Sequence, residues 1–270
     1  MNIYAGCDVG SLTSKAVIIR QKKIIGQAIA KSRVKPEESA ERVMEKALLQ
    51  AGCKLSDITY CVGTGYGRNK MSFVNKAMSE IACHAKGAQS VLPSVRTIID
   101  IGGQDCKIIK IDNQGTVVKF VTNDKCASGT GRFLEVMAKV LEIPIDDLGT
   151  LSSKSRSPIT FASTCTVWAQ ADVIKQINDG QKIEDVGAGI NNAMANRVAI
   201  LVRSLHPEKD ICMTGGVAKN AGVVAALEKM IGNRIKKIKR IDPQIAGALG
   251  AALLAEIIHL DQTKPIQTGE

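Results

Sequence analysis

The chain has 270 residues, 45% of them hydrophobic and 23% charged, which is ordinary globular composition and long enough for one large domain or two small ones. No stretch approaches the roughly 18 continuous apolar residues of a membrane helix, and the N-terminus lacks the pattern of a secretory signal, so we expect a cytoplasmic protein with no membrane contact. The formal net charge of +10 favours an acidic partner, but only 3% of residues are aromatic and no nucleic-acid-binding motif occurs, so we expect no nucleic acid partner.

The first third of the chain predicts three strands, a helix, a strand and a second helix. Apolar residues at helical spacing mark the first helix, with Pro36 near its start and Gly52 just past its end. The predicted segments are strands at 3–10, 14–20 and 22–30, a helix at 35–52, a strand at 58–65 and a helix at 75–91.

The same order begins again at residue 97 and is enlarged by extra helices. The predicted segments are strands within 97–112 and at 115–123, helices at 129–143, 166–179 and 184–205, a strand at 210–216, a helix at 220–232, a strand at 234–240 and a helix at 245–260. We therefore predict two copies of one βββαβα plan that pack with a cleft between them. The first comprises residues 1–96, completed by a C-terminal helix at about 251–270, and the second comprises residues 97–250.

Three glycine turns are candidates for an anion site. "DVGSLTSK" (8–15) and "DIGGQD" (100–105) each join two strands and carry an aspartate at the strand end. "MTGGVAKN" (213–220) ends a buried strand and opens a helix, where free N–H groups favour an anion. None of them is a P-loop or a dinucleotide-binding motif. Together, the two hairpins are able to hold a polyphosphate with its Mg²⁺, and the third turn is able to receive a nucleoside.

These turns resemble the phosphate and adenosine motifs of the actin/Hsp70/sugar-kinase ATPase superfamily. "SEIACHAKGA" (79–88) and "QIAGALGAA" (244–252) are similar to the two small-residue helices that cross in that superfamily. The resemblance implies an α/β fold of two RNase H-like βββαβα lobes with a nucleotide cleft between them.

The resemblance also implies which residues bind ATP or ADP. Asp8, Gln104 and Asp105 are expected to order Mg²⁺ and the attacking water, because phosphoryl transfer depends on positioning and charge neutralisation. The expected nucleotide contacts lie in or beside the glycine turns: Ser11, Leu12, Thr13, Ser14, Lys15, Gly102, Gly103, Gln104, Gly129, Thr130, Gly215, Gly216, Ala218, Asn220 and Gln244.

Two of the eight cysteines have a distinctive context. Cys126 in "NDKCASGTGRF" (123–133) and Cys165 in "STCTVWAQ" (163–170) each precede a helical run, and Thr164 and Thr166 are possible caps of the second. A thiolate at a helix N-terminus has a lowered pKa, which suits a metal ligand or a redox thiol, whereas two buried cysteines are the simpler alternative. Two thiolates are half of the ligand set of an iron–sulfur cluster, so either other cysteines or a second subunit must complete it.

The four motifs together resemble the ATP-dependent activators of 2-hydroxyacyl-CoA dehydratases, relatives of benzoyl-CoA reductase ATP-binding subunits and of double-cubane-cluster protein reductases. The resemblance covers residues 1–258. It implies a homodimer that shares one [4Fe–4S] cluster through Cys126 and Cys165. It also implies ATP-driven transfer of a low-potential electron from ferredoxin or flavodoxin to a partner iron–sulfur protein. Gln170 stands where several relatives are expected to carry an acidic residue, which points to a different docking partner.

Two other functions are consistent with the same turns. A small-molecule kinase of the superfamily explains all three turns and leaves the cysteines as core residues, with Asp8 or Asp105 as its base. A non-enzymatic, actin-like assembly protein is the second alternative, although no polymerisation insert is recognisable. The iron content of anaerobically purified protein discriminates between the redox and kinase functions.

Overall fold

The computed structural model describes residues 1–123, 126–161 and 165–263. Its contacts divide the chain into two compact units. Unit 1 comprises Met1–Val91 and Ile245–Glu270, and unit 2 comprises Leu92–Gln244. The part of the predicted C-terminal helix beyond residue 263 lies outside the described residues.

Unit 1 is built on a mixed sheet with the strand order β3-β2-β1-β4-β5. The strands are β1 (Tyr4–Val9), β2 (Thr13–Arg20), β3 (Lys23–Lys31), β4 (Tyr60–Thr64) and β5 (Lys76–Ala77). β1, β2 and β3 pair antiparallel, whereas β4 lies parallel to both β1 and β5. β5 falls where the sequence predicted the start of a helix. The Asn75 side chain accepts a hydrogen bond from the Cys61 amide of β4, so this segment is extended and the helix begins at Glu80.

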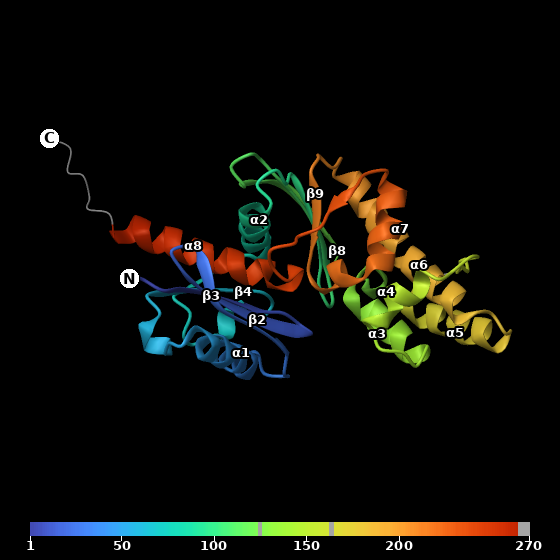
Figure 1. Cartoon of the computed structure of the whole chain (residues 1–270), viewed down its shortest axis with the longest axis horizontal. Coiled ribbons are helices and arrows are strands. Elements are labelled where there is room, and N and C mark those ends of the chain that lie inside the picture. Colours follow the sequence, from blue (N-terminus) through green and yellow to red (C-terminus); the bar gives the residue numbers. More distant parts are fainter. Residues whose placement is uncertain (124–125, 162–164, 264–270) are drawn as a thin grey trace. The chain divides into compact units, whose positions relative to one another are not determined.

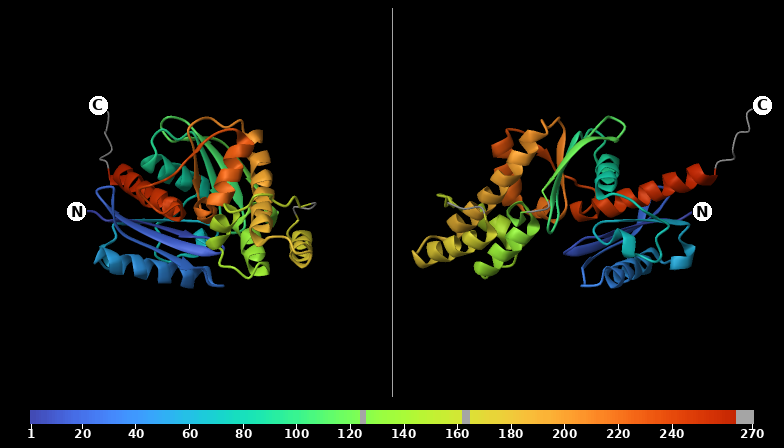
Figure 2. Two further views of the ribbon diagram at one scale, coloured as in Figure 1. Left: turned by 45° about the vertical axis from the view of Figure 1, so that its right-hand side comes forward. Right: turned by 180° about the vertical axis from the view of Figure 1, so that it is seen from behind.

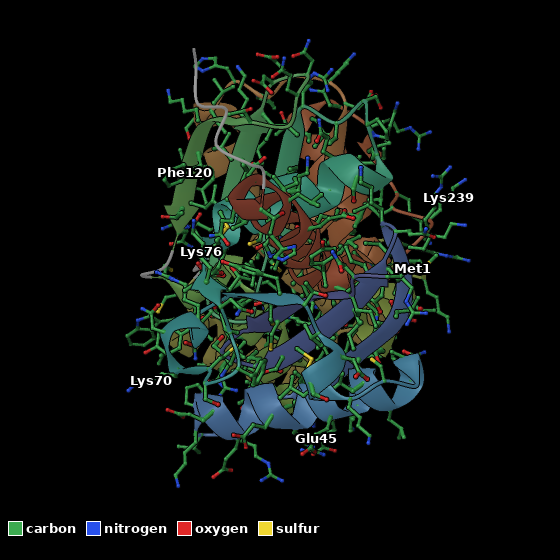
Figure 3. All side chains as sticks on the ribbon, turned by 90° about the vertical axis from the view of Figure 1, so that its left-hand side faces the viewer. Met1, Glu45, Lys70, Lys76, Phe120 and Lys239 are labelled. Atoms are coloured by element: carbon green, nitrogen blue, oxygen red, sulfur yellow. The ribbon has the colours of Figure 1, made fainter. Side chains whose placement is uncertain are left out.

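Helices cover both faces of this sheet, α1 on one side and α8 on the other (Figure 1). α1 (Pro36–Ala51) buries apolar residues at helical spacing, such as Val43 and Ala47, while its outer face carries Glu45, which points away from the unit (Figure 3). Its predicted boundaries are confirmed: Pro36 opens the helix, and Gly52 ends it in the left-handed conformation with φ 63°.

α2 (Glu80–Val91) crosses α8 (Ala246–Thr263) where both helices carry glycine. A Cβ atom on Gly87 would overlap the Ala246 carbonyl oxygen, and one on Gly250 would overlap the Cys83 carbonyl oxygen. The two backbones are therefore in direct contact, and the small residues of both helices are a requirement of this crossing.

The segment that contains α8 is also long and apolar enough to span a membrane. Residues Pro243–Thr263 reach a mean hydropathy of 1.4 over 18 residues, although polar residues interrupt the apolar run. Of that window, 56% is buried, and α8 packs against α2, β1, β2 and β4. The apolar character of α8 is therefore explained by its place in the core of unit 1.

Unit 2 contains a second mixed sheet, with the order β10-β9-β6-β7-β8. The strands are β6 (Thr97–Ile101), β7 (Cys106–Ile111), β8 (Val117–Asn123), β9 (Ile211–Thr214) and β10 (Ile235–Lys236). β6, β7 and β8 pair antiparallel, and β9 lies parallel to β6 and β10. The order repeats that of unit 1. β10 is shorter than the predicted strand at 234–240, although Ile235 and Ile238 are buried beneath the exposed basic side chains.

Helices pack beside the sheet of unit 2 (Figure 2). They bury apolar side chains such as Met194 and Val198 in one core with Ile99 and Ile108 of the strands. The helices are α3 (Gly131–Val140), α4 (Asp147–Ser152), α5 (Thr166–Asn178), α6 (Ile183–Ser204) and α7 (Ala221–Ile231). α4 was not predicted, because six residues are too few to display a helical period. The 3₁₀ turns are η1 (Leu55–Asp57), η2 (Arg68–Lys70), η3 (Ala127–Gly129), η4 (Gly216–Lys219) and η5 (Pro243–Ile245).

The glycine crossing predicts a strong effect of substitution at Gly250. We expect Gly250→Val to lower the free energy of unfolding by about 3 kcal/mol, because the new side chain must displace the backbone of α2. Urea denaturation measures this. Leu260→Val, on an exposed part of the same helix, is the control and is expected to change it by less than about 0.5 kcal/mol. Equal stability of the two variants would contradict the close crossing.

Candidate functional site

The first glycine turn closes a tight hairpin between β1 and β2 in unit 1. The Gly10 amide donates to the Thr13 carbonyl oxygen at 3.1 Å, which leaves Ser11 exposed and Leu12 and Thr13 half-buried. Asp8 and Lys15 are cross-strand neighbours, and the Lys15 Nζ atom lies 3.1 Å from the Asp8 Oδ2 atom. The hairpin therefore combines a buried carboxylate, its paired ammonium group and an exposed hydroxyl.

Ser14 supports this hairpin from inside. Its side chain is fully buried, and its Oγ atom lies 2.8 Å from the Ser32 Oγ atom, which in turn donates to the Gly10 carbonyl oxygen at 2.7 Å. The hydroxyl of Ser14 is thus bonded within unit 1, in contrast to those of Ser11 and Thr13.

The second glycine turn repeats the first in unit 2. Asp100 and Lys107 are cross-strand neighbours at the same spacing of seven residues, and the Gly102 amide donates to the Asp105 carbonyl oxygen at 3.0 Å. The Lys107 Nζ atom lies 2.6 Å from Asp105 Oδ2 and 3.8 Å from Asp100 Oδ2, while the side chain of Gln104 is exposed. Asp100, rather than Asp105, is therefore the counterpart of Asp8.

Sequence reasoning missed Asp100 and Lys107 as site residues, although a signal was present. "DVGSLTSK" and "DIGGQDCK" share the pattern Asp, apolar, Gly, four residues, Lys. Aligning the two motifs pairs Asp100 with Asp8 and Lys107 with Lys15. Both side chains are buried, so each charge must be stabilised by the opposite charge and by neighbouring polar groups in place of water.

The third glycine turn begins beside Asp100. β6 and β9 are parallel neighbours with Asp100 opposite Thr214, and the Thr214 hydroxyl donates to Asp100 Oδ1 at 2.8 Å. Gly215 follows with φ 82°, where a Cβ atom would overlap the Ile101 carbonyl oxygen. The carboxyl ends of two parallel strands thus bring the second and third turns to one edge of the sheet, as in other α/β ligand sites.

The residues predicted to hold the nucleoside divide into two groups. Gly216 is exposed beside Gln244, whose Oε1 atom accepts a hydrogen bond from Lys219 Nζ at 3.3 Å, and Ala218 lies half-buried in the same turn. Asn220 instead caps α7, since its Oδ1 atom accepts from the Val223 amide at 3.0 Å. The structure thus gives Asn220 a helix-capping contact at the position where a nucleotide contact was expected.

Cys126 precedes a 3₁₀ turn and not directly an α-helix. It is the N-cap residue of η3, half-buried, and α3 begins only at Gly131. Hydrogen bonds from the hydroxyl and then the backbone of Ser128 lower the pKa of the Cys126 thiol, with a smaller contribution from Arg197. Local hydrogen bonds, and not the dipole of a long helix, therefore favour the thiolate here.

The Cys126 turn is connected to the second glycine turn through backbone hydrogen bonds. The Gly131 and Arg132 amides donate to the Gly102 and Gly103 carbonyl oxygens at 2.9 and 2.8 Å. Between them and Cys126 lie Gly129 and Thr130, two predicted nucleotide contacts that are both buried. The Thr130 hydroxyl donates to the Ala127 carbonyl oxygen at 2.8 Å, which stiffens this connection.

Cys165 is the N-cap residue of α5 and is exposed. Of its two predicted caps, Thr164 lies outside the described residues. The prediction that Thr166 caps the helix was wrong, because its buried Oγ1 atom has no hydrogen-bond partner among the described residues. α5 lies at the periphery of unit 2 beside α3 (Figure 1), and beyond Cys165 its exposed surface carries Val167, Trp168, Ile174 and Ile177.

Five of the other six cysteines fill the cores: Cys7, Cys61, Cys83, Cys106 and Cys212 are buried, whereas Cys53 is half-buried. Burial raises the pKa of Cys61, Cys83 and Cys212 to about 12, so these thiols stay protonated and are poor metal ligands. Cys126 and Cys165 are thus chemically distinct from them.

The two accessible thiols fit half of an iron–sulfur ligand set. Such a cluster takes four thiolates, and within residues 1–123, 126–161 and 165–263 no group of three or more His, Cys, Asp or Glu side chains is arranged to hold a metal. A Mg²⁺ ion needs fewer protein ligands, because one or two carboxylates bind it together with substrate phosphates and water. A single carboxylate is enough for this, and each hairpin has one, Asp8 in unit 1 and Asp105 in unit 2.

Comparison with known proteins relates the whole chain to one group of ATPases. The model of the BadF/BadG/BcrA/BcrD ATPase family matches residues 5–255. The (R)-2-hydroxyglutaryl-CoA dehydratase activating ATPase of Acidaminococcus fermentans is 46% identical over 264 residues, covering 94% of this chain and 98% of that one.

Solved structures support the same relationship and the predicted fold class. The activator of the 2-hydroxyisocaproyl-CoA dehydratase from Clostridium difficile, with bound ADPNP, is 41% identical and matches with a TM-score of 0.92 over 98% of this chain and 100% of that one. A ROK family glucokinase from Streptomyces griseus is 12% identical, with a TM-score of 0.56 over 95% of this chain and 100% of its own. At that identity the glucokinase shows the fold alone, which agrees with the predicted α/β fold of the actin/Hsp70/sugar-kinase type.

The contrast among the cysteines predicts their chemical reactivity. In cluster-free native protein, we expect iodoacetamide to modify Cys126 and Cys165 while the five buried cysteines stay unmodified until urea unfolds the chain, because the reagent needs an accessible thiolate. Peptide mass spectrometry measures the modified fraction at each site. Modification of Cys61 or Cys212 at the rate of Cys165 would contradict the burial described above.

Proposed function

The chain belongs to the BadF/BadG/BcrA/BcrD ATPase family, and from that membership we propose that it is the ATP-hydrolysing activator of a 2-hydroxyacyl-CoA dehydratase or a related iron–sulfur enzyme. Ferredoxin or flavodoxin supplies an electron to the activator, and ATP hydrolysis drives its transfer at low potential to the partner. Relatives named for 2-hydroxyglutaryl-CoA and 2-hydroxyisocaproyl-CoA dehydratases have similar sequence identity to this chain. We therefore propose a 2-hydroxyacyl-CoA as the partner enzyme's substrate without naming the acyl group.

The observation that carries this proposal is the pair of backbone hydrogen bonds between the second phosphate hairpin and the Cys126 segment. A shift of the Gly102 and Gly103 carbonyls moves the Gly131 and Arg132 amides, because each bond joins main chain to main chain without a flexible side chain. Movement at the start of α3 is passed to α5, which packs against it and begins after Cys165. Phosphate binding and both cysteines are thereby coupled within unit 2.

The cysteines are proposed to hold the cluster with those of a second copy of the chain. Cys126 contributes a thiol whose pKa is lowered, and Cys165 contributes an exposed one. A [4Fe–4S] cluster bound there supplies one-electron transfer at low potential. A two-fold axis doubles both thiols, and the exposed apolar residues of α5 beside Cys165 provide a surface for the homodimer.

The hairpins are proposed to perform the ATPase step. Asp8 holds Mg²⁺ in unit 1, while in unit 2 Asp105 and the exposed side chain of Gln104 orient the attacking water. The amide of Gly103, the hydroxyls of Ser11 and Thr13, and Lys15 bind phosphate oxygens, so that charge is neutralised without a covalent intermediate.

A sugar-type kinase is the alternative from a different class. The glucokinase likeness extends to the fold alone, whereas the relative with 46% identity is an activating ATPase. A kinase function also gives no reason for an exposed cysteine at the start of α5. We therefore retain the activator function.

The cluster proposal predicts the iron content of three variants. Anaerobically purified protein is expected to be brown, to contain about four iron atoms per dimer and to bleach in air. We expect Cys126→Ser and Cys165→Ser each to abolish iron binding and to leave ATP binding intact, whereas Cys53→Ser, at a half-buried cysteine of unit 1, keeps the iron. Colourless, iron-free anaerobic protein that phosphorylates a sugar would favour the kinase instead.

The coupling between the second hairpin and the Cys126 segment predicts the effect of a substitution at Gly131 on the response of the cluster to nucleotide. A Cβ atom on Gly131 would lie 3.0 Å from the Gly102 carbonyl oxygen, so Gly131→Val must push the two segments apart. In the wild type, we expect the rate of iron extraction by a chelator to differ between the ADP and ATP-analogue states. Gly131→Val should lose most of that difference while it retains ATP binding. Gly187→Ala, at a glycine with only ordinary contacts, is the control.

A further inference from the structure

A turn in unit 1 repeats the geometry of the nucleoside turn in unit 2. β4 ends at Thr64, opposite Asp8 of the parallel strand β1, just as β9 ends at Thr214 opposite Asp100. The next residue is glycine in both units, Gly65 with φ 86° and Gly215 with φ 82°. A short 3₁₀ turn follows in each, η2 and η4. The segment "TGYGR" (64–68) is therefore the unit 1 counterpart of "TGGVAK" (214–219).

This unit 1 turn lies directly beside Asp8. A Cβ atom on Gly65 would be 2.5 Å from Asp8 Oδ1 and 2.6 Å from the Val9 carbonyl oxygen, so only a glycine backbone allows this approach. The Gly67 amide donates to the same Val9 carbonyl oxygen at 3.0 Å. The turn is thus held against the strand end that carries the candidate Mg²⁺ ligand.

Arg68 is the cation that this turn adds to the site. The other cation beside Asp8 is Lys15, which is bonded to that carboxylate. The Arg68 Nη1 atom donates to the Gly65 carbonyl oxygen at 3.3 Å, and within the described part of the chain no carboxylate pairs with it. The guanidinium group is half-buried and is bonded to Gly65, the residue that lies against Asp8. It has further N–H donors left for a phosphate.

We propose that Arg68 binds the γ-phosphate of ATP and stabilises the charge that develops on it during hydrolysis. The inference rests on the proposed ATPase function. In that reaction the oxygen of water bonds to the γ-phosphorus, the bond from phosphorus to the bridging oxygen breaks, ADP leaves with those electrons, and a proton of the water is released. A guanidinium group donates two parallel hydrogen bonds to phosphate oxygens, which an ammonium group does not reproduce.

The experiment compares Arg68→Gln with Lys70→Gln, a cation of the same 3₁₀ turn that projects from the surface (Figure 3). We expect Arg68→Gln to lower kcat for ATP hydrolysis about 10- to 100-fold, the effect of losing charged hydrogen bonds. It should also weaken binding of a non-hydrolysable ATP analogue while the affinity for ADP stays that of the wild type. Lys70→Gln should match the wild type, and Arg68→Lys should recover part of the lost rate.

A structural role for Arg68 gives different results. If Arg68→Gln weakens ADP and the ATP analogue equally, or if its rate equals that of Lys70→Gln, the inference is overturned. Thermal unfolding of all three variants at the wild-type temperature shows that the turn is intact. Absence of ATPase activity in the wild-type protein itself would instead contradict the proposed function, so the two failures are distinguishable.

Discussion

The hydrogen bonds from the Gly131 and Arg132 amides to the Gly102 and Gly103 carbonyls are the constraint on which the functional architecture of unit 2 depends. They join the second glycine turn to the segment that carries Cys126, and α3 extends the connection to α5 and Cys165. Because the bonds run between backbones, a side-chain rotation does not release them. The close approach of Gly131 to the hairpin makes the connection sensitive to any added side chain.

Burial separates the cysteines into two chemical classes. Those in the strands and in α2 lie in apolar cores where the charged form is disfavoured, so their thiols remain protonated and serve as packing groups. Cys126 has hydrogen-bond donors at its sulfur, and Cys165 stands at the exposed start of α5. The same residue type therefore fills the core at one position and presents an accessible thiol at another, according to its partners and its access to solvent.

Local signals predicted most of the elements. Proline and glycine marked the ends of α1, and short runs of apolar residues marked β1 and β2. The predictions differed from the structure where long-range pairing decided the outcome. The segment at 75–79 has a helical pattern but bonds to the edge of β4, and β10 retains only the two residues that pair with β9. The roles of Ser14 and Asn220 depend on Ser32 and on the amide of α7, which composition and spacing do not reveal.

By itself, the sequence determined the repeated plan of strands and helices, the three glycine turns and the two unusual cysteines, because turn chemistry and hydrophobic period are local properties. Only the tertiary structure decided which charged residues meet. The pairing of β6 with β7 and β9 buries Asp100 between Lys107 and Thr214, and the parallel register of β1 and β4 brings the Arg68 turn to Asp8. The contacts of Asp100 with Thr214 and of Asp8 with the Arg68 turn join residues far apart along the chain. Their positions follow from strand register, which is set when the whole sheet forms.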